Sequence, residues 1–282
     1  MTGAQIATDL EEALSALDRD PGATVLAGGT DVMVEINAGH RRPAAVVAVG
    51  RVRSLRGWTV AGSTLRIGAA ATYTDMLDAQ FGAAAPALAE AARTVGSPQI
   101  RNAGTIGGNV GTASPAGDTL PVLVALDAVI VLASLGGERR VPLAELITGP
   151  KRTAIAPGEL IVAVEVPTGP DLIEEYLKVG TRNAMVIAVA SCALVFDRAR
   201  GEVRVGLGSV GPMPLRAPAA EAWVAERLGP DVRVADAALT GEFGRRVAAE
   251  ARPIDDHRST ADYRRHAIGV LAGRALRRAV AA

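Results

Sequence analysis

The stretch Gly104-Thr-Ile-Gly-Gly-Asn-Val-Gly-Thr-Ala-Ser-Pro-Ala-Gly-Asp118 is the segment from which the fold of this chain is best inferred. It contains five glycines, two threonines, a serine and a closing aspartate. Glycine lets backbone amides approach a ligand closely, and small hydroxyl and amide side chains add hydrogen bonds without filling the space. A simple chain reversal needs only about one or two glycines. The stretch therefore predicts a binding loop.

A second glycine turn, Ala27-Gly-Gly-Thr-Asp31, follows the apolar Thr24-Val-Leu26 and precedes a helical pattern over 31–38. Amides at the start of such a helix can meet a pyrophosphate. Neither glycine segment is a Walker A motif or a Rossmann fingerprint. Taken alone, the two-glycine turn is equally compatible with a purely structural strand-to-helix connection. Together, the two segments predict a large cofactor that carries phosphate.

Composition narrows the class of protein. The 282 residues are 49% hydrophobic and carry 30 basic and 30 acidic side chains. A chain without net charge offers no broad basic surface for nucleic acid, so we expect no such partner. Apolar runs such as 121–132 are too short to span a bilayer, and residues 1–20 lack the pattern of a secretory leader. We expect no membrane span and a cytoplasmic location.

The cysteine and histidine content argues against a metal site in this chain. The single cysteine, Cys192, lies in an apolar run over 186–196, which is typical of a buried structural thiol. One thiol excludes an internal disulfide and any cluster held by several thiolates of this chain alone. The three histidines, His40, His257 and His266, lie far apart and lack the spacing of metal ligands.

Hydrophobic periodicity predicts the order of helices and strands. Residues 1–50 are predicted to form a small βαβ-like unit, in which a capping box of Thr8 and Glu11 starts the first helix and strand 45–49 pairs beside strand 24–26. Beyond it, Asp118 is predicted to cap helix 119–126, and the Pro-Thr-Gly-Pro segment 167–170 to mark a domain boundary. The further predicted strands are 59–61, 65–68, 129–132, 160–166, 175–179, 186–196 and 203–208, and the further predicted helices are 72–81, 84–95, 217–228, 234–250 and 259–281.

These motifs resemble a known family. Ala27–Asp31, Gln99–Asn109 and Ala113–Asp118 together look like the FAD-binding, medium subunit of the molybdenum hydroxylases, which include xanthine dehydrogenases and aerobic carbon monoxide dehydrogenases. The resemblance extends over essentially the whole chain. Its later segments are Tyr176–Asn183, Gly206–Arg216 and Tyr263–His266.

The resemblance implies an α+β fold. It consists of a two-subdomain FAD-binding fold of the vanillyl-alcohol-oxidase/PCMH type, followed by a C-terminal α+β domain with a small antiparallel sheet. The expected divisions are FAD-binding subdomain 1 at 1–55, FAD-binding subdomain 2 at 56–168, and the C-terminal domain at 169–282. The flavin is expected in a cleft between the two N-terminal subdomains, with the C-terminal domain completing its site.

The resemblance also implies which residues bind FAD, without a covalent link, and we call these sixteen the predicted cofactor set. By their own sequence context, Ile161 would be a core residue and Lys178 a solvated strand lysine. The family promotes both to the flavin end, where a cation would favour the anionic reduced ring. No residue of this chain is expected to be catalytic or to bind a metal. The set comprises Val25, Leu26, Ala27, Gly28, Gly29, Thr30, Asp31, Val32, Thr105, Gly108, Asn109, Thr112, Ser114, Asp118, Ile161 and Lys178.

Functionally, the family resemblance implies an electron relay. The expected partners are a large subunit with the molybdenum cofactor and a small subunit with two [2Fe-2S] clusters, assembled as a dimer of heterotrimers. Electrons would pass through the clusters to FAD and then to NAD, a quinone, oxygen or another acceptor. Two alternatives remain at this point: a free-standing flavin oxidoreductase, and a non-redox assembly module that has lost FAD. Arg101 and Asn102 are candidates for a subunit contact, while Tyr73 and Arg182 are surface candidates without an assigned role.

Overall fold

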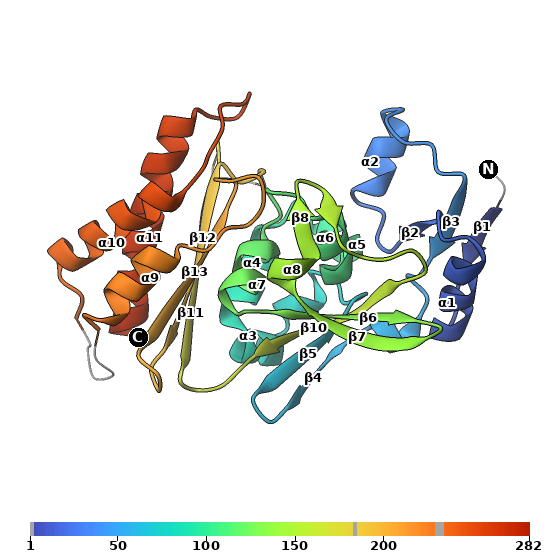
Figure 1. Ribbon diagram of the computed structural model, residues 1–282, viewed down its shortest axis with the longest axis horizontal. Helices are drawn as coiled ribbons and strands as arrows, with labels where there is room; N and C mark the ends of the chain where they lie inside the picture. Colours follow the sequence, from blue (N-terminus) through green and yellow to red (C-terminus); the bar gives the residue numbers. More distant parts are fainter. Residues whose placement is uncertain (1–2, 183–184, 229–233) are drawn as a thin grey trace.

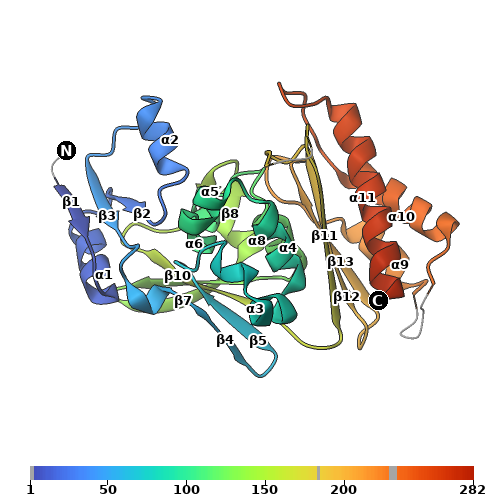
Figure 2. The ribbon, with the colours of Figure 1, turned by 180° about the vertical axis from the view of Figure 1, so that it is seen from behind.

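The structure, a computed structural model, describes residues 3–182, 185–228 and 234–282. The three larger of its four sheets follow one another along the long axis of the molecule, in the order of the sequence (Figure 1). Seen from behind, the same three bodies keep this order, with the C-terminal helices on the outer side of the last sheet (Figure 2). Asn183, which ends one of the family-like segments, lies outside the described residues.

The first body is a parallel three-stranded sheet. Its strands β1 (Gly3–Ile6), β3 (Ala45–Ala48) and β2 (Thr24–Leu26) lie in the order β1-β3-β2, so β3 pairs beside β2 as predicted. Helix α1 (Leu10–Arg19) packs its apolar face on this sheet, and the short helix α2 (Val32–Asn37) follows the first glycine turn. Strand β1 was not predicted, because only Ile6 among its residues is a large apolar side chain.

The predicted capping box at α1 was wrong by one residue. Asp9 is the N-cap, and its carboxylate accepts a hydrogen bond from the amide of Glu12 at 2.8 Å. The Glu12 carboxylate in turn accepts from the backbone amide of Thr8 at 2.8 Å. The arrangement is close to a capping box, but Glu12 accepts from the amide of the residue before the N-cap and not from that of the N-cap itself. It uses Asp9 and Glu12 instead of Thr8 and Glu11.

The second body is an antiparallel five-stranded sheet in the order β4-β5-β10-β6-β7. Its central strand β10 (Leu160–Pro167) pairs with β5 (Thr64–Gly68) on one side and β6 (Val129–Ser134) on the other. The outer strands are β4 (Trp58–Ala61) and β7 (Gly137–Pro142). The further elements of this body are α3 (Ala79–Ala84), α4 (Pro86–Thr94), α5 (Pro98–Ala103), α6 (Ile106–Thr112), α7 (Thr119–Ala125), α8 (Leu143–Leu146), β8 (Ile147–Gly149) and β9 (Arg152–Thr153), with 3₁₀ turns at Arg53–Leu55 and Asp75–Leu77.

The predicted helix over 72–81 was wrong. Residues Asp75–Leu77 form a 3₁₀ turn, and helix α3 begins only after Asp78. The reason is local, because the Asp78 carboxylate accepts hydrogen bonds from the amides of Gln80 and Phe81 and so starts a new helix. Phe81 is then fully buried in the core of the second body.

The third body is an antiparallel meander of β11 (Leu172–Val179), β12 (Ala190–Asp197) and β13 (Glu202–Gly208). Helices α9 (Pro218–Ala225), α10 (Ala237–Glu250) and α11 (Ala261–Ala281) cover its outer face. Cys192 is buried in this core, and burial raises the pKa of its thiol to about 12. The expected strand over 186–196 starts only at 190, because residues 186 and 187 line a cavity.

Helices α4 and α7 of the second body pack against the inner face of the meander. Exposed Asp127 adds ion pairs across this contact, with Arg204 at 3.0 Å and Arg216 at 2.6 Å. The side chains of Ala193 and Val195 on β12 belong to the same buried cluster as those of α7. The third sheet is therefore fixed on the second body by a shared core as well as by charge.

Candidate cofactor-binding site

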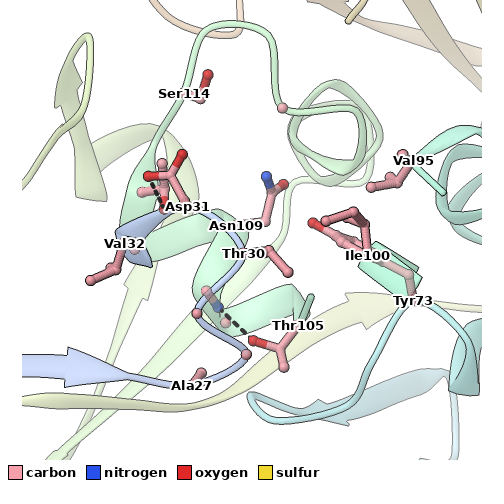
Figure 3. Close-up of a pocket in the computed structure, with 18 of the residues that line it drawn as sticks. Ala27, Thr30, Asp31, Val32, Tyr73, Val95, Ile100, Thr105, Asn109 and Ser114 are labelled. Atoms are coloured by element: carbon pink, nitrogen blue, oxygen red, sulfur yellow. Dashed lines mark hydrogen bonds between the residues drawn. The ribbon is translucent and has the colours of Figure 1, made fainter. Parts of the chain in front are cut away.

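A large cavity is formed where the three bodies meet. Its volume is about 1040 Å³, which is at the upper end of the range for small-molecule and cofactor sites. The walls come from both predicted glycine segments, from strand β10 and from the C-terminal domain. Figure 3 shows the first glycine turn crossing over the helix that contains the second.

The first glycine turn is shaped by close contact with helix α5. A side chain at position 28 would run into the backbone carbonyl of Ala103, so only glycine fits there. Gly29 has a φ of +72°, a left-handed conformation that glycine adopts without strain. The turn therefore needs both glycines, and they bring its backbone against the second segment.

The second glycine segment is largely helical instead of forming a loop. Residues Ile106–Thr112 form helix α6, and the Thr105 hydroxyl caps it by accepting from the amide of Gly108 at 3.0 Å. Asn109 accepts a hydrogen bond from the Thr119 hydroxyl at 2.6 Å. The Thr112 hydroxyl lies 3.5 Å from Asp31, which links the two glycine segments. Several of the polar side chains thus build the wall of the cavity as well as facing it.

Asp118 does not cap helix α7, contrary to the sequence prediction. Its side chain makes no capping hydrogen bond and turns toward strand β11. There it accepts from the Lys178 ammonium at 2.7 Å and from the Tyr176 hydroxyl at 3.1 Å. The side chains of Asp118 and Lys178 are only 10% and 8% exposed. Burial raises the pKa of Asp118, and the charge of Lys178 together with these hydrogen bonds opposes that rise.

Fourteen of the sixteen residues in the predicted cofactor set line the cavity. The exceptions are Leu26 and Lys178. Lys178 reaches the cavity wall only through Asp118, and it also donates to the Thr94 carbonyl at 3.1 Å. The role of each residue toward FAD stays a prediction. The fold shows that residues as far apart in the sequence as Val25 and Ile161 line the same cavity.

Several cavity residues were missed by sequence analysis. Tyr73, expected at the surface, is buried beside Gly104, and burial raises the pKa of its hydroxyl. Arg101 donates to the carbonyls of Val95 and Gly96 at 2.9 and 2.7 Å and so fixes the segment after α4, which lines the cavity. These contacts hold the chain together internally, so they do not identify Arg101 as a subunit contact.

A group of ion-paired side chains lies at one side of the cavity. Helix α2 buries none of its side chains, and the ammonium of Lys151 reaches it from the β8–β9 turn. The Lys151 nitrogen lies 2.6 Å from Glu35 and 3.9 Å from Asp31. On the C-terminal side, Arg182 and Arg258 also line the cavity. No motif in the sequence marked Glu35 or Lys151, because their ion pair joins segments 116 positions apart.

The cavity has the features that FAD requires. The first glycine turn brings the backbone of residues 28–32 to the cavity, as binding of a pyrophosphate requires, whereas the amides of residues 106–109 are hydrogen-bonded within the chain. Apolar side chains such as Val49, Leu55 and Ile161 offer contacts for aromatic rings. Four cationic side chains line it, namely Arg41, Lys151, Arg182 and Arg258. Such a fold and cavity define an FAD-binding subunit of an oxidoreductase.

Comparison with known families identifies the chain further. Residues 1–169 match the family described as FAD binding domain in molybdopterin dehydrogenase. Residues 175–279 match the family described as CO dehydrogenase flavoprotein C-terminal domain. The chain belongs to the FAD-binding medium subunits of the molybdenum hydroxylases of the carbon monoxide dehydrogenase and xanthine dehydrogenase type.

Individual relatives match over nearly their whole length. The chain is 32% identical to the glyceraldehyde dehydrogenase medium chain of Sulfolobus acidocaldarius, covering 96% of this chain and 95% of that protein. It is 30% identical to the xanthine dehydrogenase FAD-binding subunit of Escherichia coli O157:H7, covering 98% and 95%. The structure of carbon monoxide dehydrogenase from Hydrogenophaga pseudoflava matches with a TM-score of 0.89 at 30% identity, covering 99% and 98%. The expected PCMH-type fold with its C-terminal α+β domain is thus confirmed.

Two absences hold for the part of the chain that the structure describes. No helix in that part is long and apolar enough to cross a membrane. Among the same residues, no three His, Cys, Asp or Glu side chains gather where a metal ion could bind.

Proposed function

We propose that this chain holds one FAD without a covalent link in the cavity between its three bodies and relays electrons within a molybdenum hydroxylase complex. The observation that carries the proposal is the convergence of fourteen predicted cofactor residues on one cavity of suitable size. When bound, FAD supplies the ability to accept single electrons and to deliver them in pairs. The chain's own residues bind the cofactor, orient it and set the charge around it.

A large partner subunit with the molybdenum cofactor would reduce two [2Fe-2S] clusters of a small partner subunit. These clusters would then pass the electrons to the FAD of this chain. The electrons would leave to NAD, a quinone, oxygen or another acceptor. Support comes from relatives that are medium chains or FAD-binding subunits and that match over most of their length. A dimer of such heterotrimers in the cytoplasm is the assembly we propose. The same relatives favour this function over a free-standing flavin oxidoreductase or a flavin-free module.

The experiment that tests the relay uses the complex purified with its partners. FAD, iron and molybdenum are quantified, and one portion of the complex is stripped of FAD. Both portions are reduced with dithionite, freed of excess reductant by gel filtration, and mixed with NAD, a quinone or oxygen. We expect the flavin-free complex to retain the electron paramagnetic resonance signal of reduced clusters and to reduce acceptors slowly, with recovery when FAD is added. Undiminished acceptor reduction without FAD would overturn the relay.

A further inference from the structure

One face of strand β11 packs against helix α4. Side chains two residues apart on a strand point to the same face, so Glu174, Tyr176 and Lys178 share one face. All three are buried or nearly so, although two of them carry ionisable groups that are normally solvated. Strand and helix lie side by side in both views of the molecule (Figures 1 and 2).

Glu174 accepts a hydrogen bond from a backbone amide at the N-terminus of α4. The residue at the N-cap position is Ala85, which has no side chain able to cap, and Pro86 at the first position has no N–H. The amide of Ala87 donates to the Glu174 carboxylate at 3.1 Å. A residue of the C-terminal domain therefore provides the cap that the helix lacks in its own sequence.

Lys178 donates a hydrogen bond to a backbone carbonyl at the C-terminus of α4. Its ammonium donates to the carbonyl of Thr94, the last residue of α4, at 3.1 Å. Nine helical residues span roughly 13 Å, and four strand residues span about the same distance. An acidic group at the N-terminus and a basic group at the C-terminus are both favourable in the field of the helix dipole. The strand thus presents an acidic side chain to the N-terminus of the helix and a cation to its C-terminus.

The end of α4 that Lys178 holds continues into the cavity. Val95, Gly96 and Ser97 follow Thr94 directly and line its wall. Asp118, which also lines the wall, receives the other hydrogen bond of Lys178. A shift of α4 along β11 would therefore move the 95–97 segment and remove the Thr94 carbonyl, one of the two acceptors that hold the Lys178 ammonium beside Asp118.

We propose that β11 clamps helix α4 at both ends, and that Glu174 and Lys178 act as positioning residues which hold the 95–97 segment and the Asp118 carboxylate in the geometry that binds FAD. The inference rests on the proposed FAD function of the cavity. It assigns a role to Glu174 that the sequence did not suggest. It also moves Lys178 from contact with the flavin to support of the wall behind it.

The test compares Glu174→Ala and Glu174→Gln with Glu175→Gln in the full-length chain. Glu175 is the adjacent residue of the same strand, and its carboxylate faces Arg278 at 3.6 Å, away from the N-terminus of α4. Hydrogen exchange of the amides in 86–97 is measured without FAD, and the FAD dissociation constant is measured by flavin fluorescence. Lys178→Met and Lys178→Arg provide the corresponding pair at the other end.

We expect Glu174→Ala to accelerate exchange across 86–97 and to weaken FAD binding about tenfold, the equivalent of one lost cap. Glu174→Gln, which keeps an accepting oxygen, and Glu175→Gln should stay within about twofold of wild type. Lys178→Arg should retain more affinity than Lys178→Met. If Glu174→Ala does not fold, the Lys178 pair decides by the same two readouts.

The outcomes separate this inference from the proposed function. Unchanged exchange in Glu174→Ala would overturn the clamp, and so would faster exchange with unchanged FAD affinity, because the link to the cavity would then be absent. Neither result affects the proposed function as long as wild type and Glu175→Gln bind FAD. Failure of wild type to bind FAD would instead refute the proposed function.

Discussion

At the scale of single residues, Asp118 shows what sequence can and cannot predict. Its position after the glycine segment marked it as a cofactor residue, and it does line the cavity. Its predicted role as a helix cap was wrong, because its partner Lys178 is 60 positions away in the sequence. Local spacing predicts local hydrogen bonds, whereas an ion pair between two domains depends on how the domains pack. The same reason explains why the contacts of Tyr73 and Lys151 were missed.

The buried pair gives a prediction for stability. Asp118→Asn should lower the free energy of unfolding by roughly 3–5 kcal/mol, because it leaves the Lys178 ammonium buried without its counter-ion. The double variant Asp118→Asn/Lys178→Met should lose less than the sum of the two single variants, since it removes both charges. Chemical denaturation of the four proteins measures this cycle. Strictly additive losses would show that the two side chains do not interact.

Glu174 gives a prediction for pH dependence. Burial raises its pKa to about 7 from the ordinary value of 4.5. The unfolded carboxyl ionises first as pH rises, so the folded chain binds more protons between these values and loses stability with increasing pH. Relative to Glu174→Gln, wild type should lose up to roughly 3 kcal/mol of unfolding free energy between pH 4.5 and 8. Denaturation curves at both pH values measure it, and a constant difference between the two proteins would contradict it.

At the scale of elements, strands with apolar runs were predicted well, whereas the exposed edge strand β7 was not predicted. β10 and β13 lie close to their predicted ranges, since each carries several buried aliphatic side chains. β7 was missed because four of its six residues are exposed polar or glycine positions at a sheet edge. The glycine segment was predicted as a loop, although much of it is helix α6. Glycine content indicated the function of this element better than its conformation.

The first glycine turn gives a prediction at this scale. Gly28→Ala should abolish FAD binding or weaken it at least about tenfold, because the added methyl group overlaps the Ala103 carbonyl and forces the turn away from α5. Gly22→Ala is the matched control, since a methyl group there meets only the Asp20 carboxylate at an ordinary 3.4 Å. Fluorescence titration of both variants measures the effect. Equal affinities would mean that the turn does not shape the site.

At the scale of the whole molecule, the fold could be predicted from the family resemblance over the entire chain. The contacts that build the site depend on how the three bodies pack together. Composition indicated a chain without a nucleic-acid surface, and the motifs indicated a flavoprotein. What the sequence could not predict is that the C-terminal sheet places buried ionisable groups behind the cavity wall, where Lys178 holds Asp118 and Glu174 accepts a hydrogen bond from the N-terminus of α4. These residues connect the two parts of the chain that match separate families.

The central claim is that this chain binds FAD in the cavity between its three bodies. The most direct measurement is a titration of the purified, folded chain with FAD, followed by absorbance and flavin fluorescence. We predict saturable binding of one FAD per chain, which replacement of Gly108 and Asn109 abolishes while the circular dichroism spectrum stays unchanged. Absence of binding by a folded chain, even after partner subunits are added, or binding that those replacements leave intact, would contradict the claim.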